Sequence, residues 1–225
     1  MNTKRRGIIY AACAALISAL AAVPAAGASA TPFAAEPHVS RAGASSTSPS
    51  SNVIAEARAV QVRYLDGTQT AADVSWVKQN PEISKWILDP SKSTLRIVSS
   101  TRVPNTHGAS PLSDYCTSDG YAGDEYGAGG MKLYTYFSHV KYCMNATRIT
   151  SIPEHTAYFT DINGGINVVS NMLLNQASMA SNNGYVTHEG HAQYCVTPYG
   201  CLFNYYPKIT WTLYPWSPAT AVFTH

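Results

Sequence analysis

The chain has 225 residues, of which 15 are basic and 13 acidic, and only 12% of its residues are charged while 45% are hydrophobic. Residues 1–30 carry three of the basic residues and none of the acidic ones, so the remainder has a net charge of −1. A nearly neutral chain gives no electrostatic reason to expect nucleic acid or an anionic membrane as a partner.

Residues 1–30 have the order of a secretory signal peptide. Three basic residues (4–6) precede an apolar run over residues 7–23, Pro24 follows, and the small residues 28–30 offer a cleavage site. The apolar run is shorter than the roughly 20 residues that a membrane-spanning helix needs. We therefore predict a secreted protein without a membrane partner once this segment is removed, and a retained N-terminal anchor is the alternative.

Two further segments precede the main domain. Residues 31–52 are rich in Ala, Ser and Pro, which predicts a disordered linker. Residues 53–111 are predicted to form a small helical segment or subdomain. Thr70 and Asp73 have the spacing of a capping box, and Pro81 suits the first position of a second helix. A strand is predicted at residues 94–98, and a segment of this size is expected to dock on the domain C-terminal to it. Whether it is a pro-segment stays open.

Residues 112–225 are predicted to form a β-rich domain. From Ser113 onward the chain contains 13 of the 15 tyrosines but only 11 charged residues. Turn signals separate predicted strands at residues 131–143, 148–152, 157–160, 185–196 and 201–214. Residues 172–174 fit either a short helix or a buried strand. The pattern predicts a mainly β fold, an antiparallel β-sandwich or barrel, preceded by the small α-helical segment.

Four cysteines lie beyond residues 1–30, namely Cys116, Cys143, Cys195 and Cys201. An even number in an oxidising compartment predicts two disulfides. A turn-forming insert separates Cys195 from Cys201, which favours the pairs Cys195–Cys201 and Cys116–Cys143 over the other pairings. A zinc site is the competing interpretation, but neither a C-x-x-C spacing nor a paired histidine supports it.

Two stretches resemble elements of an uncharacterised family of secreted actinobacterial proteins. The first comprises residues 140–145 and 148–150, and the second comprises residues 193–195, 200–201 and 206–207. The resemblance extends over residues 115–215 and implies a signal peptide, a β-rich C-terminal domain and the same disulfide pairing. It implies no catalytic residue. Tyr142 and Met144 stand where this family usually has tryptophans.

The histidines supply candidate catalytic groups without a recognised motif. His188 and His191 stand three residues apart beside Gly190 in a predicted strand, where their side chains point to opposite faces rather than to one zinc ion. We interpret them as exposed polar residues. His139 and His155 could act as general bases, but no G-x-S-x-G nucleophile elbow accompanies them.

The acidic residues also suggest sites. Asp114, Asp119, Asp124 and Glu125 stand among glycines, which would suit a calcium loop, although the spacing differs from an EF-hand and favours a solvated acidic loop. Glu154 and Glu189 would serve a glycosidase only if the fold brought them together. We predict no catalytic residue, no metal site and no cofactor, and enzymatic activity stays open with a non-catalytic role favoured.

The tyrosines supply the predicted binding surface. Tyr134, Tyr136 and Tyr142 share one face of a strand, where they either stack against sugar rings or fill the core. Tyr199 lies in the turn between Cys195 and Cys201, where a disulfide would hold it rigid, as in a protease inhibitor.

From these features we predict a secreted, non-catalytic β domain that binds a surface or polymer, with carbohydrate and cell wall as candidates. A polysaccharide or an extracellular protein is the expected partner. The alternatives are a proteinaceous inhibitor or toxin-like effector that uses the Cys195–Cys201 hairpin, and a secreted hydrolase with an unrecognised site.

Overall fold

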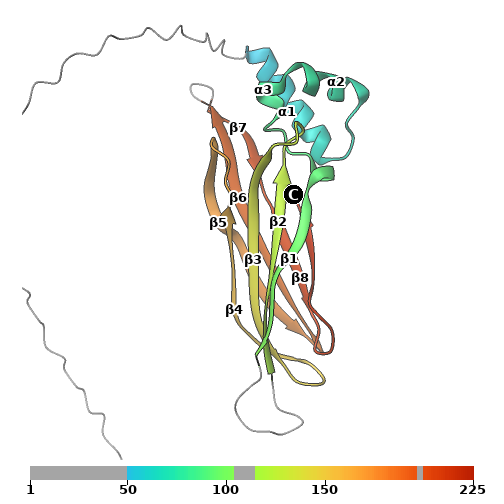
Figure 1. The fold of residues 1–225 in the computed structure, drawn as a ribbon, viewed down its shortest axis with the longest axis vertical. Coiled ribbons are helices and arrows are strands. Elements are labelled where there is room, and N and C mark those ends of the chain that lie inside the picture. Colours follow the sequence, from blue (N-terminus) through green and yellow to red (C-terminus); the bar gives the residue numbers. More distant parts are fainter. Residues whose placement is uncertain (1–49, 104–114, 197–199) are drawn as a thin grey trace, which may run out of the picture. The chain divides into compact units, whose positions relative to one another are not determined.

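The computed structural model describes residues 50–103, 115–196 and 200–225, all of which belong to one compact unit (Figure 1). The predicted signal peptide lies outside the described residues, as does nearly all of the predicted linker. The helices are α1 (Ser51–Leu65), α2 (Ala71–Gln79), α3 (Pro81–Ser84) and the 3₁₀ turn η1 (Pro90–Lys92). The strands are β1 (Thr94–Val103), β2 (Tyr115–Tyr126), β3 (Lys132–Met144), β4 (Ile149–Thr160), β5 (Ile166–Ala180), β6 (Asn183–Val196), β7 (Gly200–Tyr205), β8 (Lys208–Leu213) and β9 (Thr220–Thr224).

The strands form two antiparallel sheets that face each other. One sheet has the order β1-β2-β3-β4, and the other has the order β5-β6-β8-β9, with β7 also paired to β6. The two sheets contact each other through side chains that point between them: the Tyr121 ring lies edge-on to Trp211, and the Tyr136 hydroxyl donates to the backbone carbonyl of Asn171. No ladder joins the two sheets among the described residues. The predicted mainly β fold is confirmed as the sandwich rather than as a closed barrel.

The alternation of buried and outward-facing residues along the strands shows where the core lies. In β8 the side chains of Ile209, Trp211 and Leu213 are buried, while Thr210 and Thr212 lie on the other face. Period-two burial of this kind is expected where one face of a sheet is packed and the other is solvated.

The predicted strands at residues 148–152 and 157–160 are one continuous strand, β4, which forms the predicted hairpin with β3.

Residues 172–174 belong to strand β5, so the short-helix interpretation is wrong. They are not a buried strand either, because Leu173 is 55% exposed. Between the pairs Ser170–His191 and Leu174–Glu189, β5 advances four residues while β6 advances two. This bulge turns Asn171 towards the other sheet, where its side-chain oxygen accepts from the backbone N–H of Phe159.

The helices pack on the sandwich. The predicted capping box is present: Thr70 Oγ1 accepts from Asp73 N–H at 3.3 Å, and Asp73 Oδ2 accepts from Thr70 N–H at 2.7 Å. Helix α1 begins at Ser51, inside the predicted 31–52 linker, with Ser50 as its N-cap. The Tyr205 hydroxyl of β7 donates to the Trp86 carbonyl just after α3, and side chains of α1 belong to the same apolar core as the sheets.

Both predicted disulfides are present. Cys116 lies directly opposite Cys143 in the β2–β3 ladder, and Cys195 lies directly opposite Cys201 in the β6–β7 ladder. The strand register therefore explains the pairing, since opposite residues of an antiparallel pair bring their side chains together on one face. These bonds are consistent with an extracellular protein.

Candidate functional site

The tyrosine row predicted on β3 is buried rather than exposed. Tyr134 and Tyr136 have no exposed surface, and Tyr142 exposes 1%. Their side of β3 faces the five-stranded sheet, and the Tyr142 hydroxyl donates to Asp119 Oδ2 at 2.9 Å. Burial raises the pKa of all three phenols. The prediction that these residues bind a ligand is therefore wrong, because they fill the core. Tyr199, the fourth predicted binding residue, lies outside the described residues.

A different pair of tyrosines is exposed on the outward side of the five-stranded sheet. Tyr185 is 40% exposed and Tyr206 is 43% exposed. Along β6 the even-numbered Val186, His188 and Ala192 are buried, so the odd-numbered residues point away from the core. We call the outward-pointing residues of this sheet the outer face.

The outer face consists mainly of hydroxyl and amide side chains in register across neighbouring strands. One row contains Ser178, Tyr185, Thr212 and Thr220. The next row contains Gln176, Thr187, Thr210 and Val222. A third row, beyond the end of β8, contains Asn167, Gln193 and Asn204. Since directly opposed residues share a face, each row is a nearly continuous line of neutral hydrogen-bonding groups.

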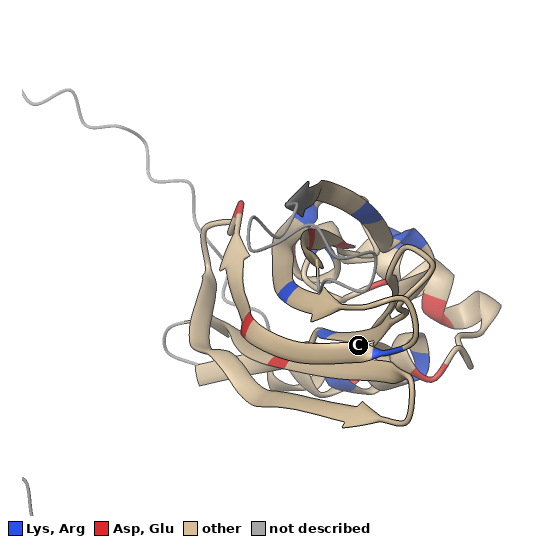
Figure 2. Cartoon of the chain, turned by 90° about the horizontal axis from the view of Figure 1, so that it is seen from below, with Lys and Arg blue, Asp and Glu red and all other residues tan. Residues whose placement is uncertain are grey.

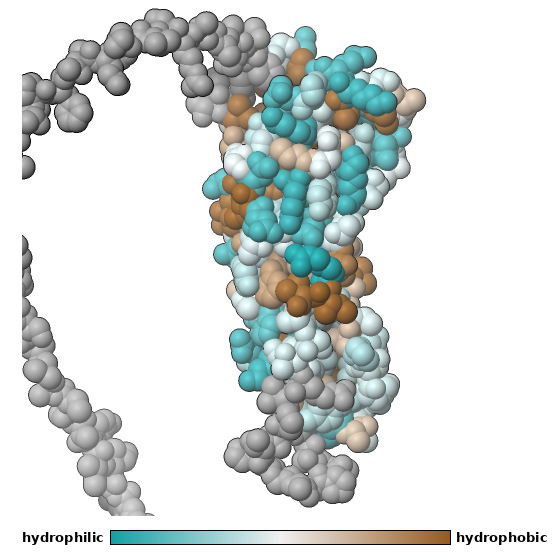
Figure 3. All heavy atoms as spheres, in the orientation of Figure 1, coloured by the Kyte–Doolittle hydropathy of each residue, from teal (hydrophilic) through white to brown (hydrophobic). Residues whose placement is uncertain are grey.

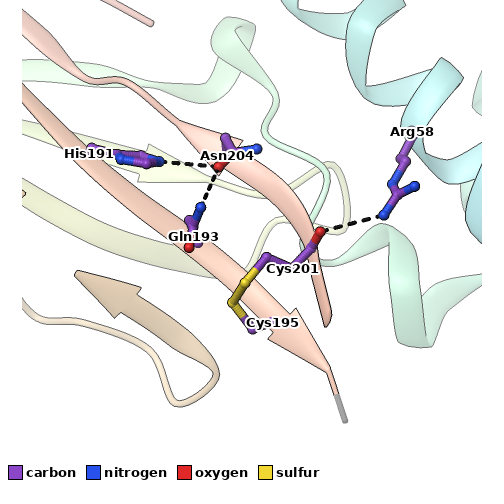
Figure 4. Close-up of a disulfide and its surroundings, with 6 residues drawn as sticks. All are labelled: Arg58, His191, Gln193, Cys195, Cys201 and Asn204. Atoms are coloured by element: carbon purple, nitrogen blue, oxygen red, sulfur yellow. Dashed lines mark hydrogen bonds between the residues drawn. A yellow bond between two sulfur atoms is a disulfide. The ribbon is translucent and has the colours of Figure 1, made fainter. Parts of the chain in front are cut away.

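A polar cluster around Asn204 forms one end of the outer face (Figure 4). Asn204 Oδ1 accepts from Gln193 Nε2 at 2.8 Å and lies 3.1 Å from His191 Nε2. The His191 ring stacks on Tyr206, with centroids 4.6 Å apart and planes inclined by 14°. The Cys195–Cys201 disulfide lies further along the same β6–β7 ladder. These contacts hold Tyr206 and the surrounding amides in defined positions, so the cluster is preorganised.

The outer face has almost no net charge. Strands β5 to β9 contain two charged side chains, Glu189 and Lys208, whose Oε2 and Nζ atoms lie 2.7 Å apart. The other sheet carries more charge, including a cluster in which Arg96 and Lys132 both pair with Asp124. Figure 2 shows long strand segments without charged residues. Figure 3 shows the side of the molecule that faces the reader in Figure 1, where hydrophilic side chains are mixed with separate hydrophobic patches.

His188 is fully buried, so its interpretation as an exposed residue is wrong, although His188 and His191 do point to opposite faces. Trp211 Nε1–H donates to Ser138 Oγ at 2.7 Å, which leaves the Ser138 hydroxyl to donate to His188 Nδ1 at 2.7 Å. This pattern assigns the His188 proton to Nε2, which lies 3.2 Å from His155 Nδ1. Burial, and then the neighbouring His155, lowers the pKa of His188 to about 4.

The remaining candidate bases do not form a catalytic site. His139 Nε2 lies 2.6 Å from Ser118 Oγ, a nucleophile–base distance, but both residues stand on the outward side of the four-stranded sheet. Neither lines either of the two cavities described for this structure. Acyl transfer needs a site that holds substrate against both groups, and this pair lacks one among the described residues. His155 contacts His188 rather than a hydroxyl nucleophile.

The acidic residues predicted to form a loop stand on strand β2. Asp119 and Glu125 face the core while Asp124 faces the other side, so they cannot share one calcium ion, and all three are buried rather than solvated. Asp114 lies outside the described residues. Burial alone would raise the pKa of Asp124, but hydrogen bonds from Thr135, Lys132 and Arg96 lower it to about 2.

Glu154 and Glu189 lie on different sheets. Glu154 is exposed on β4 opposite Lys141, whereas Glu189 is paired with Lys208 on the outer face. The fold therefore does not bring them together as the two carboxylates of a glycosidase. Within residues 50–103, 115–196 and 200–225, no group of three or more His, Cys, Asp or Glu side chains could hold a metal ion.

A cavity of about 450 Å³ lies where the α2–α3 segment meets the ends of β6 and β7. Its apolar lining includes Val53, Ile83, Trp86, Val196 and Leu202. This volume is within the range of small-molecule sites. The sequence patterns did not indicate this cavity, because its walls come from α1 and the α3 region and from β6 and β7, whose lining residues lie more than 100 residues further along the chain.

No helix among the described residues combines the length and apolar character that crossing a membrane requires. Comparisons of the chain with protein-family models, with curated proteins and with solved structures found no match.

Proposed function

We propose that the chain is a secreted, non-catalytic domain that binds a neutral polysaccharide on its outer face. The observation that carries this proposal is a sheet surface with rows of hydroxyl and amide groups, two exposed tyrosines and a single internally neutralised ion pair. Two cross-strand disulfides and a signal-peptide-like leader support action outside the cell.

The chemistry of this surface suits sugar rings. A tyrosine ring offers an apolar face to the C–H groups of a pyranose, and its hydroxyl offers a polar tip. Neighbouring Thr, Asn and Gln side chains both donate and accept hydrogen bonds, as sugar hydroxyls require. An anionic polymer would find no cluster of cations here, because Lys208 is already paired with Glu189.

The extent of the outer face favours a polymer over a single sugar. Tyr206 stacks on His191, which lies six residues from Tyr185 along β6. At the rise of an antiparallel strand, six residues span about 20 Å. Two aromatic platforms separated by this distance would contact different units of one chain, and a polymer gains avidity by contacting both.

Sedimentation with insoluble polysaccharides tests the proposal. The wild-type protein is incubated with cellulose, chitin and purified bacterial cell wall, and the bound fraction is measured over a range of protein concentrations. We expect retention on at least one of them, and about tenfold weaker binding for Tyr206→Ala and for Tyr185→Ala. Tyr158→Ala is the matched control, because Tyr158 is equally exposed but stands on β4 of the other sheet. No retention, or equal loss in all three variants, would refute the outer face as the binding surface.

The inhibitor hypothesis has one supporting observation, the disulfide between Cys195 and Cys201, which stand on either side of Tyr199 in the sequence. Strand β7, which carries Cys201, is also held by Arg58, whose guanidinium donates to the Cys201 backbone carbonyl at 3.5 Å. If the segment between the two cysteines inhibits a protease, Tyr199→Ala should weaken inhibition. Unchanged inhibition in that variant would discard the hairpin mechanism.

A further inference from the structure

The cavity beside α3 has a rigid aromatic wall. Trp86 stacks on Tyr194 with ring centroids 4.1 Å apart and planes inclined by 14°, and Tyr194 lies nearly parallel to Phe203. The Tyr205 hydroxyl donates to the Trp86 carbonyl at 2.7 Å, which fixes this residue against β7. Because ring stack and hydrogen bond both join the helical segment to the sheet, the cavity is formed before any ligand arrives.

The buried lining residues Ile83, Trp86 and Leu202 are apolar, whereas Gln79 and Glu82 are exposed, so polar groups stand at the rim of the cavity. Val53, Ile83, Val196 and Leu202 add aliphatic surface to the aromatic wall. The polar lining residues are Gln79, Asn80, Glu82 and Lys85. An elongated ligand could therefore bury an apolar group against the wall while its polar end stays at the rim, which is the usual composition of a small-molecule site.

The charges at the rim compensate each other. Lys85 Nζ lies 2.7 Å from Glu82 Oε2 and 5.9 Å from the centre of the Trp86 ring. An anionic head group would have to separate Lys85 from Glu82 or lie beside the Glu82 carboxylate. A cationic head group would have to separate Glu82 from Lys85 or lie beside the Lys85 ammonium group. An uncharged head group has neither cost, and it can hydrogen-bond to the amides and to the ion pair.

We propose that this cavity binds the apolar part of a small neutral amphiphile, an alkyl or aryl group that carries an uncharged polar head. The site is independent of the polysaccharide proposal, because Tyr194 lies on the core side of β6 while the outer face uses the opposite side. A variant that loses polysaccharide binding should therefore keep amphiphile binding, and a variant that loses amphiphile binding should keep polysaccharide binding.

Isothermal titration calorimetry with alkyl glucosides, at concentrations below micelle formation, tests this inference. We expect saturable one-to-one binding of octyl β-D-glucoside to the full chain. Affinity should increase about fourfold for each methylene added from the hexyl to the octyl compound, as complete burial of each methylene predicts. Octanoate and octylammonium should bind more weakly than the glucoside. Absence of saturable heat, or affinity independent of chain length, would overturn the proposal, and equal binding of octanoate would overturn its neutral head.

A cavity-filling variant locates the binding. Val53→Phe places a larger side chain at the cavity wall and should weaken octyl glucoside binding at least tenfold. Val74→Phe is the matched control, since Val74 is exposed on α2 and does not line the cavity. Equal affinity in the two variants would place the ligand elsewhere. The chain-length series uses wild-type protein, so the proposal remains testable even if Val53→Phe does not fold.

Discussion

Acidification should destabilise the protein through His188. The imidazole has no exposed surface and accepts a hydrogen bond from Ser138 at Nδ1, while its Nε2 faces His155. Protonation would place a charge in the core and turn Nδ1 into a donor facing the Ser138 hydroxyl, whose oxygen already accepts from Trp211. The pKa of His188 is lowered to about 4 by burial first and by His155 second.

The sign and size of the effect follow from linkage. An unfolded histidine has a pKa of about 6.5, so between pH 6.5 and 4 the unfolded chain binds more protons than the folded one at this position. The stabilisation is complete above pH 6.5 and is lost as the pH falls towards 4. Between pH 7 and pH 4.5 the loss amounts to about 2.5 kcal/mol. Glu125 has the opposite effect on the free energy of unfolding, because burial raises its pKa. The lowered pKa of Asp124 affects stability only below about pH 4.

Urea unfolding at pH 7 and pH 4.5 measures this loss, and variants separate His188 from the other groups. His188→Asn keeps an acceptor near Ser138 but cannot titrate, so it should be less stable at pH 7 and lose about 2.5 kcal/mol less on acidification. His191→Asn, the same replacement on the outer face, is the control. The reasoning fails if wild type and His188→Asn lose the same free energy of unfolding between the two pH values.

Three further changes test the packing, the helix cap and the disulfide, and each is measured by urea unfolding. Gly190→Ala should cost about 1–3 kcal/mol, because the added Cβ would lie 2.7 Å from the Phe159 ring, whereas Gly164→Ala meets nothing within 4 Å and should cost far less. Thr70→Ala removes the N-cap of α2 and should cost about 1 kcal/mol, with Thr70→Ser close to wild type. Replacing the Cys116–Cys143 pair by Ser should cost about 2–4 kcal/mol, and no change in stability would mean that the bond does not constrain the unfolded chain.

The sandwich could be predicted because its strands repeat a period of two with strong turn signals between them. The alternation of Ile209, Trp211 and Leu213 with threonines identified both faces of β8. The turn-forming insert after Cys195 identified the partner of that cysteine. Helix α1 lies almost wholly within the predicted helical segment 53–111, but its start fell in the predicted linker, because its N-cap Ser50 belongs to a run of serines that is typical of a linker.

The burial of the β3 tyrosines could have been inferred from the sequence, but their alternation along the strand was not sufficient by itself. Alternation shows that Tyr134, Tyr136 and Tyr142 share a face without showing whether that face is covered. The opposite face carries Lys141 and His139, and polar groups of this kind mark the solvated side of a sandwich strand. His188 gave no comparable signal, since only the packing of the two sheets brings Ser138 of β3 to its ring and Trp211 of β8 to the Ser138 hydroxyl.

Tyr205 and Tyr206 show most directly why tyrosine content alone could not locate a binding surface. The two residues are adjacent, yet the Tyr205 ring is buried and its hydroxyl donates to Trp86, whereas Tyr206 is exposed and stacks on His191. Tyr205→Phe should cost about 1–2 kcal/mol of stability, because it leaves the Trp86 carbonyl without its donor, and it should not change polysaccharide retention. Tyr206→Ala should have the reverse effects, with retention weakened and the free energy of unfolding nearly unchanged. If Tyr205→Phe weakened retention as much as Tyr206→Ala does, binding would depend on the helical end of the sandwich and not on the outer face.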